Sequence, residues 1–396
     1  MSNNMTVDPV FKHVAGNMTG FHVWRIEKMQ VVTLPSEAWG KFFTGDAYIV
    51  LSSAPHGTSG GIGLKSGLHN GRVEQHIHFW LGEEASTDEA AIAAYKSVEL
   101  DEHLGGSPIQ HREVQGQESS RFLAYFKKGI RYLSGGAKVS NEGGTGDILT
   151  EYYFKTGLSH YVEDKSPKLF HVKGKRKPIV RQMNEISWSV MNRGDSYVLD
   201  VPEYNKTIVW RGANSNRFEK LQAANFADLL KLEHGLSDIE TVLFDDGQED
   251  PDTEDGQLLH HILPFSEKSQ IKEASVTPDQ EPGVARSKIK LYRCSDDSGK
   301  LVLTEVKDGP LLQQDLKSDD SYLIDNGNFG IWVWIGKRAS QGERREAMRN
   351  AQGFIKAKQL KPDTPVTRVI DGGEPSEFKT LFKAWKDVDD ITTFSR

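Results

Sequence analysis

The stretch Gly-Asp-Ala-Tyr-Ile-Val-Leu at residues 45–51 has two related copies further along the chain. It returns as Gly-Asp-Ser-Tyr-Val-Leu-Asp at 194–200 and as Asp-Asp-Ser-Tyr-Leu-Ile-Asp at 319–325. Such self-similarity is typical of a tandem array of one module. A tryptophan follows each copy, and nine positions after it comes a glutamate: Trp80 and Glu89, Trp210 and Glu219, Trp334 and Glu343.

Length and composition set the broad class of the chain. Its 396 residues suit two to four domains, and three copies imply modules of about 120–130 residues. A net charge of −7 argues against a general nucleic-acid binder. The single cysteine, Cys294, excludes an internal disulfide framework and indicates a reducing compartment. No apolar run reaches membrane-spanning length, and the first residues lack a signal-peptide core.

Short strands before helices in every copy favour an α+β fold in which helices pack on a mixed sheet. Strands are predicted at 21–34, 42–52 and 76–81, and helices at 86–104 and 119–133. The dense acidic stretch that starts at Asp245 is predicted to begin a linker. The predicted organisation is an extension (1–19), module 1 (20–161), module 2 (168–244), the linker (245–286), module 3 (287–388) and a tail (389–396).

The recurring acids form a candidate calcium site in each module. Asp46, Asp195 and Asp320 each begin a predicted strand, and the three glutamates lie in the first turn of a predicted helix. Calcium takes six to eight oxygens, partly carboxylate and partly backbone carbonyl. Two such acids could share one cation if the strand folds beside the helix end. The alternative is that each glutamate only caps its helix, since Ser86, Asn216 and Ser340 precede them at capping-box spacing.

Three other patterns have a structural and a functional interpretation. The basic clusters at 127–132 and 168–177 are either solvated faces or surfaces for an acidic protein or anionic lipid. In the helix 86–104, Ile92, Tyr95 and Val98 follow helical spacing and could face the core or a partner's cleft. His76 and His78 alternate on a strand and could bind zinc, but no paired ligands follow at helical spacing, so ordinary strand histidines are favoured.

Together these residues resemble the gelsolin, severin and fragmin family of actin-filament regulators. The resemblance covers nearly the whole chain, and three modules rather than six place it with severin-like members. Segments that carry it include Trp-Arg-Ile-Glu-Lys at 24–28, Gln-His-Arg-Glu-Val-Gln-Gly at 110–116, Leu-Phe-His-Val-Lys-Gly at 169–174, Gly-Ala-Asn-Ser-Asn-Arg at 212–217 and Trp-Val-Trp at 332–334.

The resemblance implies a five- or six-stranded sheet between a long and a short helix in every module, with one calcium ion in each. The first site would use the Gly45 carbonyl, Asp46, Glu89 and a later carbonyl, either of Ala137 or of Phe154. The second would use Gly194, Asp195 and Glu219, and the third Asp319, Asp320 and Glu343.

The resemblance also implies surfaces for actin and for phosphoinositides. A further calcium shared with actin would lie at Asp101, Gly106 and Pro108. Actin itself would contact Ile92, Tyr95, Glu99 and Asp101 in module 1, and Arg217 and Lys220 in module 2. Phosphoinositides would compete with actin at the basic clusters: Lys127, Lys128, Arg131, Lys168, Lys173, Lys175, Arg176 and Lys177.

The function that follows is a cytoplasmic, calcium-regulated protein that severs actin filaments, caps their barbed ends and nucleates new ones, as a monomer or in 1:1 to 1:2 complexes with actin. Capping without severing is the alternative within this class. A calcium-dependent adaptor on phosphoinositide surfaces is the alternative of another class. An enzyme is the least favoured, because no nucleophile–base pair or metal–histidine set is evident in the sequence.

Overall fold

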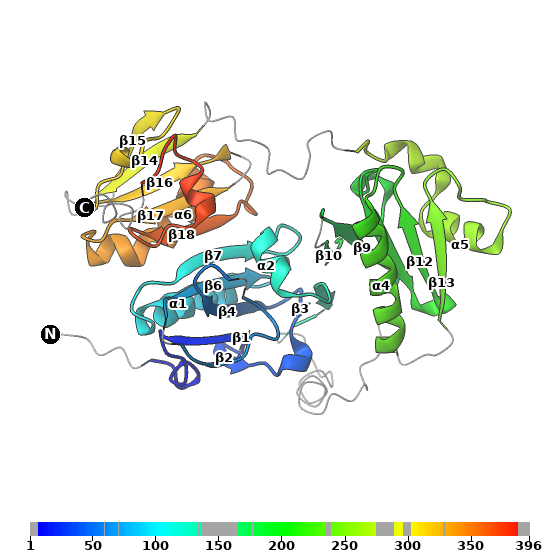
Figure 1. The fold of residues 1–396 in the computed structure, drawn as a ribbon, viewed down its shortest axis with the longest axis horizontal. Helices are drawn as coiled ribbons and strands as arrows, with labels where there is room; N and C mark the ends of the chain where they lie inside the picture. The colour runs from blue at the N-terminus through cyan, green and yellow to red at the C-terminus, as the bar shows by residue number, and fades with distance from the viewer. Residues whose placement is uncertain are drawn as a thin grey trace, which may run out of the picture.

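The computed structural model describes residues 7–58, 60–69, 71–133, 135–136, 165–175, 178–234, 239–274, 289–295, 302–327 and 330–386. Figure 1 shows three α+β modules, which we call module 1 (described residues up to 136), module 2 (165–274) and module 3 (289–386). Short 3₁₀ helices occur at Pro9–Phe11, Ser36–Ala38, Trp188–Val190, Pro202–Tyr204, Phe265–Gln270 and Gln313–Asp315.

The three modules share one strand order, as the repeated sequence predicts. In module 1 the order is β2 (Gln30–Thr33), β1 (Met18–Glu27), β4 (Ala47–Pro55), β6 (Val73–Leu81) and β7 (Ile109–Val114). In module 2 it is β10 (Ile179–Gln182), β9 (Lys168–Lys173), β11 (Ser196–Val201), β12 (Lys206–Arg211) and β13 (Glu240–Asp245). In module 3 it is β15 (Val302–Asp308), β14 (Lys290–Ser295), β16 (Ser321–Asp325), β17 (Ile331–Ile335) and β18 (Val366–Ile370).

A long helix joins the last two strands of every module. Those two strands are parallel, so the chain must cross over between them, and a helix is the usual crossover. The crossover helices are α1 (Thr87–His103), α4 (Arg217–His234) and α6 (Gln341–Ala357). Shorter helices follow the last strand: α2 (Ser120–Tyr125), α5 (Glu254–Ile262) and α7 (Ser376–Lys379). Module 1 also holds the short strands β3 (Lys41–Phe43), β5 (Gly67–Leu68) and β8 (Arg131–Leu133).

Modules 1 and 3 share one continuous eleven-stranded sheet. The junction is the antiparallel pairing of β7 with β18, where Arg112, His111 and Gln110 lie opposite Val366, Thr367 and Arg368. In Figure 1 the cyan β7 and the red-orange β18 lie along the facing edges of the two modules. One apolar layer covers a common face of the joined sheet, from Ile49 and Leu100 of module 1 to Leu323 and Met348 of module 3. The long helices α1 and α6 therefore pack on the same face.

Module 2 has its own five-stranded sheet and touches module 1 along β10. Ile130 of module 1 forms a parallel bridge with Arg181, and the Arg181 guanidinium donates a hydrogen bond of 2.6 Å to the carbonyl oxygen of Gly116. The helix α4 and the helix α5 bury different apolar clusters, α4 through Phe226 and α5 through Leu259. This module therefore has the predicted arrangement of a sheet between a long and a short helix.

The acidic stretch after module 2 differs from the linker predicted for 245–286. Its described part, up to residue 274, packs on module 2: Leu259 and Leu263 join the module's core, and Asp246 and Glu249 form ion pairs with Lys268. The acidic residues of 245–256 run into the first turn of the short helix α5 and obscured its apolar spacing in the sequence. Residues 275–286 of the predicted linker lie outside the described residues.

Two smaller predictions also differ from the structure. The helix predicted at 119–133 ends at Tyr125, and the chain then turns into β8. The strand predicted at 42–52 is divided into β3 and β4 by a turn at residues 44–46. In the part of the chain that the structure describes, no helix is long and apolar enough to span a bilayer.

We expect Leu259→Ala to destabilise module 2 by about 2–5 kcal/mol, because Leu259 is fully buried in its core. The measurement is hydrogen exchange of peptides from β11 and β12, whose slowest amides report opening of the module. Leu243→Ala is the control, since Leu243 lies on β13 but is 52% exposed. Equal exchange in the two variants would show that α5 is a tether rather than part of the module.

Candidate functional site

Each module contains the same turn just before the middle strand of its sheet, which is β4, β11 or β16. We call this turn, with the start of the long helix that packs near it, the corner of the module. The glycine of a Trp-x-Gly motif donates its N–H to the carbonyl of the predicted calcium-binding aspartate: Gly82 to Asp46 (3.0 Å), Gly212 to Asp195 (3.1 Å) and Gly336 to Asp320 (3.0 Å). A Cβ at Gly82 would lie 2.2 Å from the Thr44 carbonyl oxygen, and one at Gly336 would lie 2.2 Å from that of Ser318. Only glycine fits this close approach, which brings the start of the long helix to the aspartate.

The glutamates do cap their helices, as the alternative interpretation of the sequence predicts. The Glu89 carboxylate accepts from the Ser86 N–H (2.9 Å), and the Glu343 carboxylate accepts from the Ser340 N–H (2.9 Å), each within a full capping box. In module 2, Glu219 accepts from the N–H groups of Asn216 and Gly174, both at 2.9 Å. Capping does not explain their burial with the aspartates: the six carboxylate residues are 0–6% exposed.

The residues that precede the aspartates lie at the same corners. Gly45 donates to the Gly135 carbonyl (2.8 Å), and a Cβ on Gly136 would lie 2.7 Å from Asp46 Oδ1. The chain after α2 therefore returns to the first candidate site. Ala137 and Phe154, the alternative carbonyl donors, lie outside the described residues. Gly194 donates to Asn192 Oδ1 (2.8 Å), and Asp319 is exposed and paired with Arg338.

Each buried aspartate has an internal basic or hydrogen-bonding partner that the sequence prediction missed. Arg25 contacts Asp46 Oδ2 at 2.6 and 2.7 Å, His171 Nε2 lies 2.7 Å from Asp195 Oδ2, and Arg293 contacts Asp320 Oδ1 at 2.7 Å. These partners occupy one structural position. Each lies on the first strand of its pair opposite the tyrosine that follows the aspartate by two residues: Tyr48, Tyr197 and Tyr322. That register is the signal that could have identified them.

Module 2 holds its aspartate by hydrogen bonds more than by a permanent charge. Burial lowers the pKa of His171, which favours its neutral form. Burial alone would raise the pKa of Asp195, but the hydrogen bonds from His171 and Asn192 and the charge of Lys173 hold this pKa below its ordinary value. Asp195 is therefore ionised at neutral pH, as a metal ligand must be.

The donor set of these corners fits a hard cation. In module 1 the candidate donors are the buried carboxylates of Asp46 and Glu89 and the backbone carbonyl of Gly45, which precedes Asp46. Calcium prefers such oxygen ligands. The internal partners Arg25, His171 and Arg293 supply the counter-charge or hydrogen bonds that buried carboxylates require in the present arrangement.

The residues matched to a calcium shared with actin lie at the junction of modules 1 and 3. Asp101 is buried and bonds Arg368 of β18 at 3.0 Å, although burial still raises the pKa of the Asp101 carboxyl. Gly106 follows the end of α1 in the left-handed region (φ +71°) and donates its N–H to the Asp101 carbonyl. Pro108 is buried just before β7. A cavity of about 390 Å³ lies here, lined by Val98, Asp101, Gly106, Arg344, Arg345 and Arg368 among others.

The helix α1 divides the predicted actin-binding residues. Tyr95 is 53% exposed, and Ile92 is partly buried at the edge of the core, whereas Ala93 and Leu100 form the buried face. The aromatic ring therefore points away from the core. Glu99 is buried, and its carboxylate is bonded by Lys96 (2.9 Å) and by the backbone N–H of Asp8.

The basic residues gather where modules 1 and 2 meet. Lys127 and Lys128 are exposed after α2, and Arg131 lies over the ring of Phe226 in α4 at 5.9 Å. Across β10 lies β9, which begins at Lys168 and ends at Lys173, with exposed Lys175 beyond it. Arg217 is exposed and Lys220 partly exposed in the first turn of α4, while Arg176 and Lys177 lie outside the described residues.

We expect Arg25→Gln to destabilise module 1 by about 3–5 kcal/mol in the absence of divalent metal, because it leaves Asp46 buried without its cation. Hydrogen exchange of peptides from β4 and β6 measures the change. Arg338→Gln is the control: its pair with Asp319 is exposed, and we expect no measurable change. If both variants behave like the parent protein, the Arg25–Asp46 pair does not stabilise the corner.

Comparisons with known proteins agree with the repeated architecture. The family model described as Gelsolin repeat matches residues 28–123 and 302–379. Gelsolin of Drosophila melanogaster is 36% identical over 379 residues, which are 94% of this chain and 43% of that protein, so the chain spans about two-fifths of this relative. A solved Thorarchaeota 2DGel3/rabbit actin complex includes a similar chain with 23% identity and a TM-score of 0.23, over 55% of this chain and 99% of that one. The chain belongs to the gelsolin family.

Proposed function

We propose that this chain is a calcium-regulated actin-binding protein of the cytoplasm and cytoskeleton that severs filaments, caps barbed ends and supports nucleation. The observation that carries the proposal is at the junction of modules 1 and 3. Of the residues assigned to actin on α1, Tyr95 is exposed, while Asp101 is bonded to Arg368 of module 3. This is the arrangement expected of an actin-binding surface that is partly covered until the modules separate.

Calcium would control exposure of the actin-binding surface by binding at the three aspartate corners. Gly45, Asp46 and Glu89 would hold the ion in module 1, Gly194, Asp195 and Glu219 in module 2, and Asp319, Asp320 and Glu343 in module 3. A bound ion would supply two positive charges beside these carboxylates. It shifts the balance between arrangements only if it binds one of them better. In the present arrangement Arg25 and Arg293 already neutralise Asp46 and Asp320, which lowers the gain from an added cation.

Separation of the modules would require the shared apolar layer and several polar contacts to break, two of which bear directly on the actin-binding residues. One is the short pairing of β7 with β18, which has only three residue pairs in register. The other is the buried Arg368–Asp101 ion pair. Once they are broken, Asp101, Gly106 and Pro108 would be accessible, together with the exposed face of α1.

Module 2 would bind the filament side and deliver module 1 to an actin–actin contact. Arg217 and Lys220 lie in the first turn of α4, and Leu221 beside them is 60% exposed. A charged and apolar surface of this kind suits a protein partner. Wedging by α1 would then replace a longitudinal actin contact, and no covalent chemistry is needed.

Phosphoinositides would compete for the basic surface between modules 1 and 2. Lys127, Lys128 and Arg131 of module 1 lie near Lys168, Lys173 and Lys175 of module 2 because Ile130 bridges β10. Clustered lysines and arginines attract anionic headgroups by about 1 kcal/mol each near a membrane surface. A lipid bound here would lie beside α4 and so hinder filament binding by module 2.

We expect Asp46→Asn to weaken calcium binding by module 1, because it removes one of the two carboxylate charges of that corner. Calorimetric titration of the full chain with calcium measures the loss, and Asp88→Asn, which changes an exposed acid in the same first turn of α1, is the control. Calcium binding that is unchanged by Asp46→Asn would remove this ligand assignment.

Imaging of single labelled filaments tests the proposed activity. We expect internal breaks with calcium and none with a chelator. Arg368→Gln should lower the calcium concentration for half-maximal severing at least tenfold, since breaking a buried ion pair costs about 3–5 kcal/mol and a tenfold shift needs about 1.4. Arg345→Gln is the control at the same junction, where an exposed pair with Glu102 is lost.

The same images separate the alternatives. Filaments that stop growing but never break would assign the chain to cappers without severing activity. Breakage that is equally fast in chelator would contradict regulation by calcium. Vesicle binding without filament binding would assign it to lipid-surface adaptors.

A further inference from the structure

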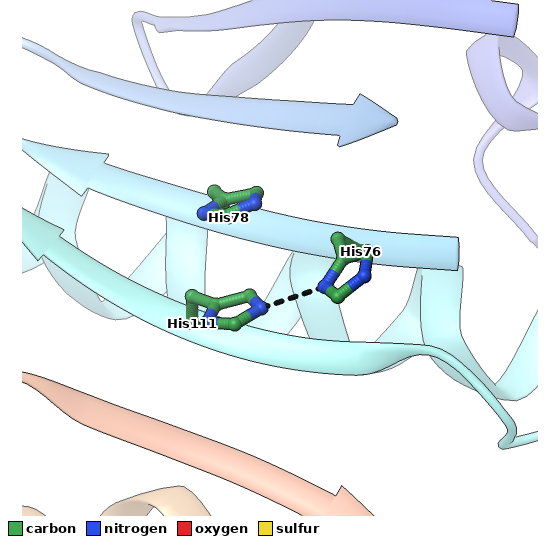
Figure 2. Close-up of side chains that lie close together, drawn as sticks. All are labelled: His76, His78 and His111. Carbon is green, nitrogen blue, oxygen red and sulfur yellow. Dashed lines mark hydrogen bonds between the residues drawn. The ribbon is translucent and has the colours of Figure 1, made fainter. Parts of the chain in front are cut away.

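Three buried histidines form a cluster in module 1 that the actin and calcium proposals do not use. His76 and His78 lie on β6 and His111 lies on the neighbouring strand β7, directly opposite His78. One nitrogen of each ring lies within 4.8 Å of one nitrogen of the other two. Figure 2 shows the three rings gathered on one face of the two strands. The sequence shows the first two histidines as a pair without further ligands, and the sheet register adds the third.

The hydrogen bonds around the cluster define where the ring protons lie. His76 Nε2 is 2.7 Å from Glu74 Oε1, and His78 Nδ1 is 2.8 Å from Glu113 Oε1. A carboxylate accepts, so each of these nitrogens carries the proton and the other nitrogen of the ring has a lone pair. The lone pair of His78 Nε2 accepts from the hydroxyl of Tyr125 at 3.1 Å.

His76 and His111 are the closest pair in the cluster. His76 Nδ1 lies 2.9 Å from His111 Nε2, drawn as the dashed line in Figure 2, so His111 donates the bridging hydrogen. His111 Nδ1 faces Thr367 Oγ1 at 3.4 Å. If the proton of His111 moves from Nε2 to Nδ1, the Thr367 hydroxyl can accept a hydrogen bond from it. The nitrogens of His76 and His111 then present two lone pairs 2.9 Å apart, so the rings must part by a few tenths of an ångström to reach the roughly 3.3 Å between ligands of tetrahedral zinc.

We propose that His76, His78 and His111 bind one zinc ion, which replaces the hydrogen between His76 and His111. Zinc takes His78 Nε2 as its third ligand, so the Tyr125 hydroxyl must turn away from that nitrogen. Three neutral imidazoles with carboxylates behind two of them form the carboxylate–histidine–zinc arrangement, in which the outer acid orients the ring and raises its basicity. A water molecule occupies the fourth position of such a site. No proton leaves the three rings, because His111 changes only its tautomer.

The charges beside the site favour a dication. The three rings are buried, with 0–7% of their surface exposed. Glu74 and Glu113 give two negative charges beside the cluster, and Arg121, which lies 3.3 Å from His76 Nε2, gives one positive charge. An imidazole set prefers zinc to calcium, which prefers oxygen.

Two metal measurements on tag-free full-length protein test the site. Titration with zinc in excess calcium should give one tight site per chain. Cobalt(II) loaded in its place should give the visible absorption of a tetrahedral ion, which does not depend on any variant. Calcium that displaces zinc, or cobalt that remains octahedral, would overturn the proposal.

Variants locate the ion. His76→Gln and His111→Gln should each abolish the tight site, and Glu74→Gln should weaken it about 10–100-fold through loss of the outer carboxylate. His13→Gln is the matched control, since His13 is exposed and contacts the ring of His22 edge-on, outside the cluster. Circular dichroism establishes that each metal-free variant is folded. Tight zinc binding that survives both His76→Gln and His111→Gln would place the ion elsewhere and refute the assignment.

Discussion

A buried carboxylate just before the middle strand of the sheet is the constraint on which each module depends. Asp46, Asp195 and Asp320 are only 0–6% exposed, and a glycine N–H donates to the backbone carbonyl of each of them. An ionised group in such a place needs a counter-charge or strong hydrogen bonds. Two modules meet this need with arginine and one with histidine. Each repeat of the fold therefore carries the same cost of burying a carboxylate.

The sequence predicted the repeated modules, the position of each aspartate at the start of a strand, and the helix caps, because these features depend on local patterns. Strand entry, capping-box spacing and the Trp-x-Gly motif lie within short windows, and Glu89 and Glu343 form the full capping boxes that their spacing indicates. It failed where distant segments decide. Arg25 and Asp46 are held together by strand register, Arg368 and Asp101 by the packing of two modules, and the acidic run before α5 obscured the apolar Leu259.

The junction of modules 1 and 3 involves the core of both modules and lies next to the histidine cluster. A single apolar layer runs under both α1 and α6, so the two modules share part of their core as well as their sheet. The histidine cluster lies next to this junction, since His111 pairs with Thr367 of β18. The cluster and the Arg368–Asp101 ion pair are therefore neighbours at this junction, because His111 lies opposite Thr367 and Gln110 lies opposite Arg368.

The eleven-stranded sheet also hides two strand edges. Any arrangement in which modules 1 and 3 part turns β7 and β18 from interior strands into outer ones, each with unpaired backbone groups that could template pairing with another chain. Arg112 and Arg368 lie on these edges, and a charge on an outer strand is a common guard against such self-association. The arginine that closes the junction would then help to keep the separated modules soluble.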